Sequence, residues 1–61
     1  MNSRVLVNFA EDNGYRMMQL ECDDQGYHVY YFEHGECLCS DTFKSEFEAR
    51  QFMTISIGLW K

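Results

Sequence analysis

Two cysteines and two histidines lie close enough in the sequence to suggest a metal site. Cys37 and Cys39 are separated by one residue, and His28 and His34 lie close by in the sequence. Residues two apart in a strand stand about 6.5 Å apart, whereas two thiolates on one zinc ion must approach to about 4 Å. The spacing therefore disfavours zinc, and we expect no cofactor. A small metal or thiol protein that uses His28, Cys37 and Cys39 remains the weaker alternative.

An acid–imidazole–acid set is the second candidate for chemistry. Glu21, His28 and Asp41 would form such a set if three strands placed them in one row, and this arrangement could support proton transfer. The sequence pattern supplies no nucleophile or oxyanion donor beside them, and 61 residues are few for an enclosed cleft. We therefore expect a solvated charge network and a protein that is not an enzyme.

Composition and charge limit the class of protein further. A length of 61 residues predicts a single domain over 1–61, and 46% hydrophobic and 16% aromatic residues argue against disorder. Ten acidic residues against five basic ones give a net charge of -5. Phosphate binding needs a basic patch, so nucleic acid is an unlikely partner. The basic residues are scattered along the chain: Arg4, Arg16, Lys44, Arg50 and Lys61.

Localisation follows from what the sequence lacks. No apolar run approaches the length of a membrane span, and the start "MNSRVLV" has no signal-peptide pattern. The cysteines number three, which fits reduced thiols better than a disulfide framework. We expect a cytoplasmic protein that does not bind membranes.

The elements that would position these residues begin with a hairpin. Asn13-Gly14 lies between two alternating runs, about 4–11 and 15–22, and is a strong type I′ turn signal. Folding there predicts one apolar face with these pairs: Val5 with Cys22, Val7 with Leu20, and Phe9 with Met18. The other face would hold Leu6 with Glu21, Asn8 with Gln19, and Ala10 with Met17.

Two further turns extend the sheet with strands at about 27–33 and 37–42. A loop of two or four residues within "DDQG" keeps Val29 and Tyr31 on the face of Leu20, and a three-residue loop would move them to the other face. The third turn is either His34-Gly35 or the four residues 33–36. Both choices predict the same pairs: Phe32 with Cys37, Tyr31 with Leu38, and Tyr30 with Cys39.

The residue pattern then changes to that of a helix over about 46–56. Ser45 and Glu48 have capping-box spacing, and Gly58 is placed to end the helix as a C′ residue. One face of the helix is apolar, with Ala49, Phe52, Met53 and Ile57. The alternative is a fifth strand in "MTISIGLW", because β-branched residues alternate there.

The predicted fold class is α+β, a four-stranded antiparallel β-meander with one C-terminal α-helix packed on one face (β-β-β-β-α). The helix-facing residues would be Val5, Val7, Phe9, Met18, Leu20, Cys22, Val29, Tyr31 and Leu38. One helix is about 10 Å across and cannot reach the other face of the sheet.

That second face predicts the function. It would carry an apolar patch with a polar margin, which is typical of a protein-binding surface. We expect a protein partner and a homodimer through this face, with Phe32 and Tyr30 favoured over the unpaired edge of strand 4–11 as the centre of the dimer. The expected binding residues are Met17, Tyr30, Phe32, Cys37 and Cys39, with Glu33 and Glu36 setting orientation. The alternative is a single-stranded nucleic-acid binder that stacks bases on Tyr30 and Phe32.

In size, acidity and meander-plus-helix organisation, the chain resembles the short accessory proteins that phages use to inhibit host enzymes. This resemblance implies an inhibitor or regulator of a host protein. It concerns organisation alone, because no motif residue matches, and it assigns no site residues.

Overall fold

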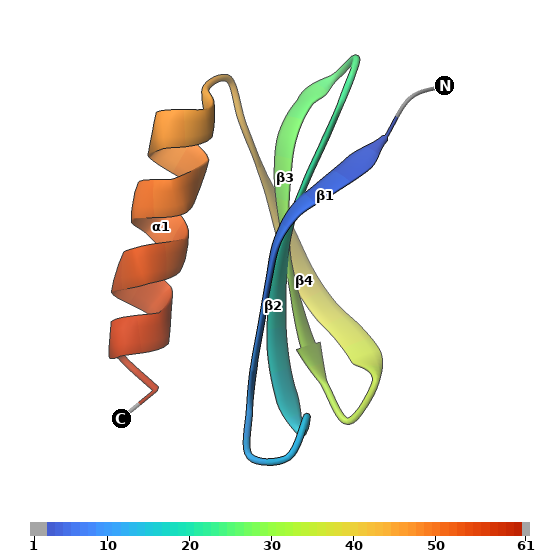
Figure 1. The fold of residues 1–61 in the computed structure, drawn as a ribbon, viewed down its shortest axis with the longest axis vertical. Helices are drawn as coiled ribbons and strands as arrows, with labels where there is room; N and C mark the ends of the chain where they lie inside the picture. The colour runs from blue at the N-terminus through green and yellow to red at the C-terminus, as the bar shows by residue number, and fades with distance from the viewer. Residues whose placement is uncertain (1–2, 61) are drawn as a thin grey trace.

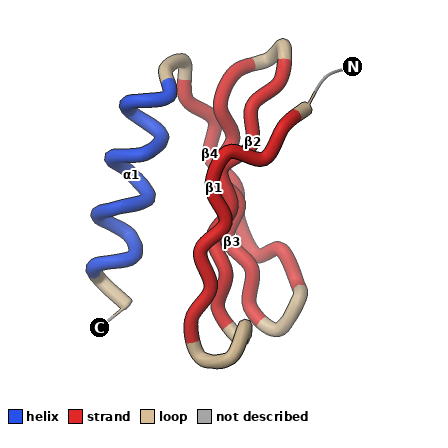
Figure 2. The backbone as a smooth tube through the Cα atoms, in the orientation of Figure 1, coloured by secondary structure: helices blue, strands red, loops and turns tan. Residues whose placement is uncertain are grey.

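The computed structural model describes residues 3–60 and shows one sheet with one helix beside it (Figure 1). The strands follow the order β1-β2-β3-β4 and each pairs antiparallel with the next. Helix α1 lies along one face of the sheet and packs against β2, β3 and β4 (Figure 2). The predicted α+β meander is therefore confirmed. Its elements are β1 (Arg4–Glu11), β2 (Arg16–Asp23), β3 (Gly26–Glu33), β4 (Glu36–Phe43) and α1 (Glu46–Gly58).

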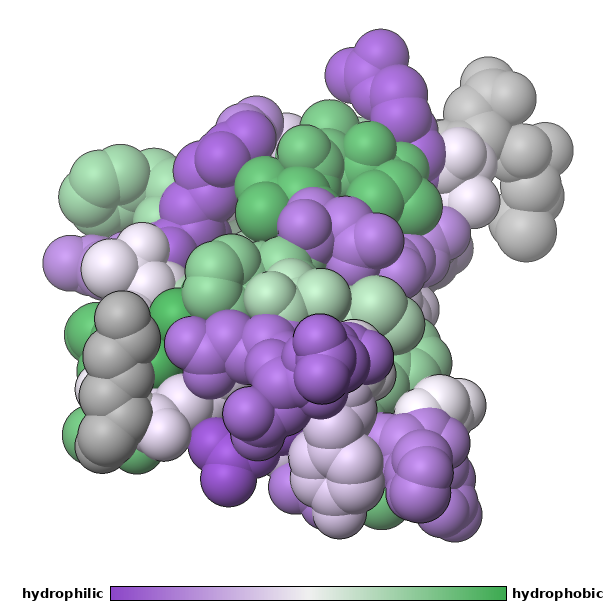
Figure 3. Space-filling model, turned by 60° about the horizontal axis from the view of Figure 1, so that its bottom comes forward, coloured by the Kyte–Doolittle hydropathy of each residue, from purple (hydrophilic) through white to green (hydrophobic). Residues whose placement is uncertain are grey.

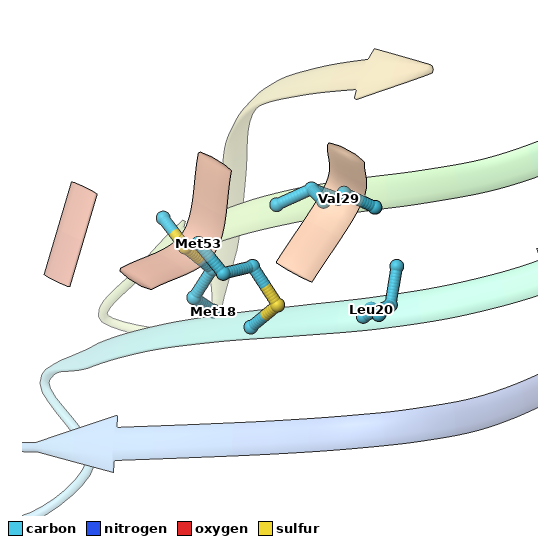
Figure 4. Packing of buried hydrophobic residues seen from close by; sticks show 5 residues of the cluster. Met18, Leu20, Val29 and Met53 are labelled. Carbon is cyan, nitrogen blue, oxygen red and sulfur yellow. The ribbon is translucent and has the colours of Figure 1, made fainter. Parts of the chain in front are cut away.

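The core lies between α1 and the two central strands. Leu20 of β2 is 0% exposed and Val29 of β3 is 2% exposed, and the two side chains come from neighbouring strands in Figure 4. The helix contributes Ala49 and Met53, which are also buried, and Met53 lies beside Met18 of β2. The prediction that Met18, Leu20 and Val29 face the helix is therefore confirmed. Burial of a large aliphatic side chain contributes about 1.5–3 kcal/mol, so these few residues hold the layers together.

The first hairpin forms at the predicted place with a wider turn. Asp12 and Asn13 have φ of 56° and 55°, and Gly14 has φ of 88°. The amide of Tyr15 donates to Asp12 O at 3.0 Å, so the predicted type I′ turn at Asn13-Gly14 is confirmed. A second bond, from the Gly14 amide to Glu11 O at 3.0 Å, closes an overlapping turn one residue earlier. Four residues, 12–15, make the loop. The predicted register from Val7 with Leu20 to Ala10 with Met17 is confirmed.

On the N-terminal side of Val7, the register of β1 shifts by one residue. Val5 pairs with Glu21, not with Cys22, and Leu6 is the extra residue of the resulting bulge. Leu6 therefore packs against the core, while Val5 is 50% exposed. The predictions that placed Val5 on the core and Leu6 on the opposite face were wrong. A bulge bends its strand and increases the local twist. As a result, the Leu6 side chain turns toward the core and the Val5 side chain turns toward solvent.

The second turn is the two-residue loop that keeps Val29 on the core. Asp23 pairs with Gly26, leaving Asp24 and Gln25 at the turn. The Asp23 carboxylate accepts a hydrogen bond from the Gln25 amide at 2.8 Å, an Asx turn. Val29 and Tyr31 therefore stay on the face of Leu20, as predicted, with Val29 opposite Leu20 and Tyr31 opposite Met18.

The third turn is His34-Gly35, with φ of 56° and 81°, and it brings Glu33 opposite Glu36. Phe32 pairs with Cys37 as predicted, but the register then shifts at Leu38. The predicted pairing of Tyr31 with Leu38 was wrong, because Leu38 is the bulged residue and is 51% exposed.

The helix confirms the predicted start and runs two residues further than predicted. The Ser45 hydroxyl accepts a hydrogen bond from the Glu48 amide at 3.2 Å, and Glu46 and Glu48 lie in the first turn. Acidic side chains there interact favourably with the helix dipole. Gly58 is the last helical residue and has no positive φ, so it is not a left-handed C′ residue; the cap is Leu59. The fifth-strand alternative was wrong. Across residues 3–60, no helix has the length and apolar composition needed to cross a membrane.

Trp60 ties the end of α1 to the sheet. Its ring lies 5.9 Å from the Phe9 ring and 5.5 Å from the Tyr31 ring, measured between centroids. The Arg16 guanidinium lies 5.8 Å above the Trp60 ring and donates a long hydrogen bond to the Trp60 carbonyl. The cation and the two aromatic contacts hold the C-terminal end of the helix against the sheet.

Candidate protein-binding face

The sheet face opposite α1, called the open face below, carries the residues predicted to bind protein. Its apolar end is one cross-strand row that the register confirms: Ala10, Met17, Phe32 and Cys37. Met17 and Phe32 are half-buried by their neighbours, and Cys37 is exposed. None of these four belongs to the cluster that packs under α1. The open face is therefore an apolar surface separate from the core.

Three rings follow one another along β3 on this face. His28 and Tyr30 have centroids 6.2 Å apart, and Tyr30 and Phe32 have centroids 6.5 Å apart. Burial among neighbouring side chains raises the pKa of Tyr30, and the nearby Glu21 carboxylate adds to that rise. Tyr30 therefore presents a neutral hydroxyl on a largely apolar ring, which suits contact with another protein.

Cys39 was predicted on the open face, and this prediction was wrong. The bulge at Leu38 places Cys39 opposite Tyr31 and puts Ser40 opposite Tyr30. Cys39 consequently lines a groove beside α1. Cys37 and Cys39 lie on different sides of the sheet, so the arrangement does not bring both thiols to one site with His28. Residues 3–60 contain no group of three His, Cys, Asp or Glu side chains that could hold a metal ion.

The predicted row of Glu21, His28 and Asp41 was also wrong, because Asp41 does not belong to it. The same bulge puts Thr42 opposite His28 and moves Asp41 to the α1 side. The imidazole lies between Thr42 Oγ1, 3.0 Å from Nδ1, and Asp23 Oδ1, 2.8 Å from Nε2. The hydrogen bond with His28 holds the pKa of Asp23 below its ordinary value. These contacts orient the ring at the polar margin of the open face.

Acidic residues gather at the end of the sheet that holds the first and third turns. The two turns touch, because the His34 amide donates to Tyr15 O at 2.7 Å and the two rings lie 5.2 Å apart. In Figure 3, which brings this end forward, hydrophilic side chains cover much of the lower surface. The acidic residues of these turns and strand ends are Glu11, Asp12, Glu33 and Glu36.

The two expected orienting residues differ in environment. The Glu33 carboxylate accepts a hydrogen bond from the Tyr31 hydroxyl at 2.5 Å, and this bond raises the pKa of Tyr31. Glu36 is exposed at the start of β4. Glu33 is therefore held on the α1 side, while Glu36 is accessible from solvent.

Sequence reasoning missed a second apolar surface, on the outer side of α1. Phe47, Ile55 and Leu59 are 73%, 60% and 79% exposed. Phe47 and Ile55 border one shallow hollow with Gln51 and Thr54, and Leu59 follows as the C-cap, four residues after Ile55. These apolar residues were visible in the sequence, but the interpretation used the apolar residues of the helix for the buried face alone.

These features define the molecule as an α+β meander with one covered and one open sheet face. The chain matches no protein-family model, and neither a curated protein nor a solved structure shows significant similarity to it.

Proposed function

We propose that this chain is a small non-enzymatic protein-binding module that acts through its open face. The observation that carries the proposal is the position of α1, which packs on one side and leaves Met17, Tyr30 and Phe32 outside the core cluster. Exposed apolar patches with a polar margin are typical of protein-binding surfaces. Here the margin is formed by His28, Glu21 and Thr42.

Two copies of the chain meet on this face when no other partner is present. Each 100 Å² of apolar surface removed from water contributes about 2.5 kcal/mol before association costs. For a small domain, whose total stability falls within about 5–15 kcal/mol, that gain is large. A two-fold axis is the commonest symmetry for such a contact.

A foreign protein replaces the second copy in the proposed function, and the module regulates that protein by covering its surface. The acidic end beside the open face steers the approach of basic partners, because clustered charge of one sign accelerates encounter with the opposite sign. This role needs no cofactor and no catalytic group.

Sedimentation velocity of wild type and Phe32→Asp over a hundredfold concentration range tests the proposal. We expect wild type to dimerise at micromolar concentration and Phe32→Asp to remain monomeric, because a carboxylate in the centre of an apolar contact is not solvated. Ile55→Asp is the matched control, since it places the same charge on the outer side of α1, where Ile55 is 60% exposed.

Two results would contradict the proposal. Dimerisation lost in Ile55→Asp but kept in Phe32→Asp would place the contact on the helix. Salt-sensitive binding of a single-stranded oligonucleotide that requires Tyr30 would favour base stacking as the function of this face.

A further inference from the structure

A groove runs between α1 and the edge strand β4, on the side of the sheet away from the open face. Its cavity of about 200 Å³ has Val29 and Tyr31 at its floor. Cys39 and Asp41 of β4 form one wall, and Phe52 of α1 belongs to the other. The groove exists because the bulge at Leu38 turns Cys39 and Asp41, two short side chains, toward the helix. Longer side chains at these positions would fill it.

The groove lies beside a free sheet edge. β4 is the last strand in the order β1-β2-β3-β4, and no other strand within residues 3–60 pairs with its outer side. Its residues are exposed from Glu36 to Thr42. An edge strand presents unpaired N–H and C=O groups, and proteins commonly block such edges with proline or lysine. β4, with the sequence ECLCSDTF, contains neither, and its segment 39–43 lies past the bulge at Leu38, where the ladder with β3 is regular again.

We propose that the groove and the β4 edge together bind an extended peptide by strand addition. The peptide backbone pairs with β4, and alternate side chains of the added strand point toward α1. One of these is apolar and enters the cavity above Tyr31. The side chain two residues along is basic and meets Asp41.

The negative charge of Asp41 determines that the peptide side chain beside it is basic. Asp41 forms no ion pair with any side chain in residues 3–60, and it lies in a groove whose other walls are mainly apolar. β4 contains two acidic residues, Glu36 and Asp41, and no basic one. A lysine or arginine beside Asp41 is therefore favoured, and an acidic side chain at the same place is repelled.

The same charges disfavour a second copy of this chain as the occupant. Two β4 strands paired about a two-fold axis would bring four acidic residues together without a cation. Pairing β1 of one copy with β4 of the next is head-to-tail, and such contacts extend without closing unless the rotation forms a ring. The fitting occupant is a basic segment of another protein.

Trp60 allows a direct test, because it is the one tryptophan in the sequence and lines the groove. The probe is an end-blocked peptide, Ser-Val-Ser-Leu-Ser-Lys-Ser, which presents valine, leucine and lysine on one side when extended. We expect a saturable change in Trp60 fluorescence and slower amide hydrogen exchange in 39–43. This readout reports on the groove whatever covers the open face.

Two control peptides separate the contributions. A peptide N-methylated at the alternate amides that face β4 keeps the side chains and cannot pair with the edge, so we expect its binding to be lost. A peptide with glutamate in place of lysine should bind at least about fivefold more weakly at low salt. Equal binding of either control peptide would overturn strand addition or the basic preference, respectively.

Protein variants complete the test. Asp41→Asn should weaken binding of the lysine peptide by about fivefold at low salt, and Asp24→Asn, the same charge change in the exposed second turn, should leave it unchanged. Ser56→Phe should fill the groove and abolish binding while circular dichroism confirms the fold. An unchanged affinity in Ser56→Phe would overturn the proposal. So would β4 amides already protected in concentrated protein without peptide, because a second copy would then occupy the edge.

Discussion

Leu20 and Gln19 are neighbours in β2, yet their side chains lie on opposite faces of the sheet. Leu20 is 0% exposed beneath α1, while Gln19 is half-buried on the open face between Asn8 and Tyr30. Because strand side chains alternate, this pair distinguishes the two faces at the scale of single residues.

Leu20→Asp should unfold the domain, whereas Gln19→Asp should lower the free energy of unfolding by less than about 1 kcal/mol. The first substitution removes core packing worth about 2–5 kcal/mol and buries a carboxylate without a partner. Urea unfolding followed by circular dichroism measures both. Similar losses in the two variants would show that the assignment of the faces is wrong.

Gly26 is the residue on which the second hairpin depends. Its φ is +132°, a conformation that side chains rarely permit, and a Cβ added there would lie 2.8 Å from the Phe43 carbonyl oxygen. Phe43 is the last residue of β4 and packs against Phe52 of α1, with ring centroids 5.2 Å apart. A substitution at Gly26 would therefore disturb β3, β4 and, through Phe43, also α1.

Gly26→Ala should lower the free energy of unfolding by at least about 2 kcal/mol, because it combines backbone strain with a contact against the main chain. Gly35→Ala is the control at the third turn. Gly35 also has a positive φ, of +81°, but a Cβ there meets no atom within 4 Å, so about 1 kcal/mol is expected. Thermal and urea unfolding of the two variants give the comparison. An equal cost at both glycines would show that the close approach to Phe43 has no effect.

The three thiols lie in three different environments of the molecule. Cys22 is half-buried, Cys37 is exposed on the open face, and Cys39 is exposed in the groove beside α1. Accessibility governs how fast such thiols are alkylated when their ionisation is similar. The cysteines therefore report which surface is covered when copies associate.

In dilute solution, Cys37 and Cys39 should be alkylated faster than Cys22. As the protein is concentrated through the dimerisation range, alkylation of Cys37 should slow at least severalfold, because the second copy covers it, while the rate at Cys39 stays constant. Peptide mass spectrometry after brief labelling measures each site. Slowing at Cys39 alone would place the contact in the groove and contradict dimerisation through the open face.

Much of this fold was predictable because its signals are local. Asn13-Gly14 specified the first turn, and the spacing of Ser45 and Glu48 specified the start of α1, since each signal acts between residues close in sequence. The centre of the open face was predictable too, because Met17 and Phe32 pair within a regular part of the β2–β3 register. The exposed apolar residues Phe47, Ile55 and Leu59 were also recognisable in the sequence, but the prediction covered only the buried face of the helix.

The two bulges could not be read from the sequence, and they account for the errors at Val5, Leu38, Cys39 and Asp41. Both occur where successive residues are all apolar, "VLV" at 5–7 and "CLC" at 37–39. A slip of one residue normally exchanges a polar side chain for an apolar one, which makes the register visible in the pattern. In these two runs the exchange leaves the pattern unchanged, so the choice falls to packing between distant segments. Leu6 is drawn into the core, Cys39 is turned toward α1, and the groove beside β4 exists only once the helix and the twisted sheet have come together.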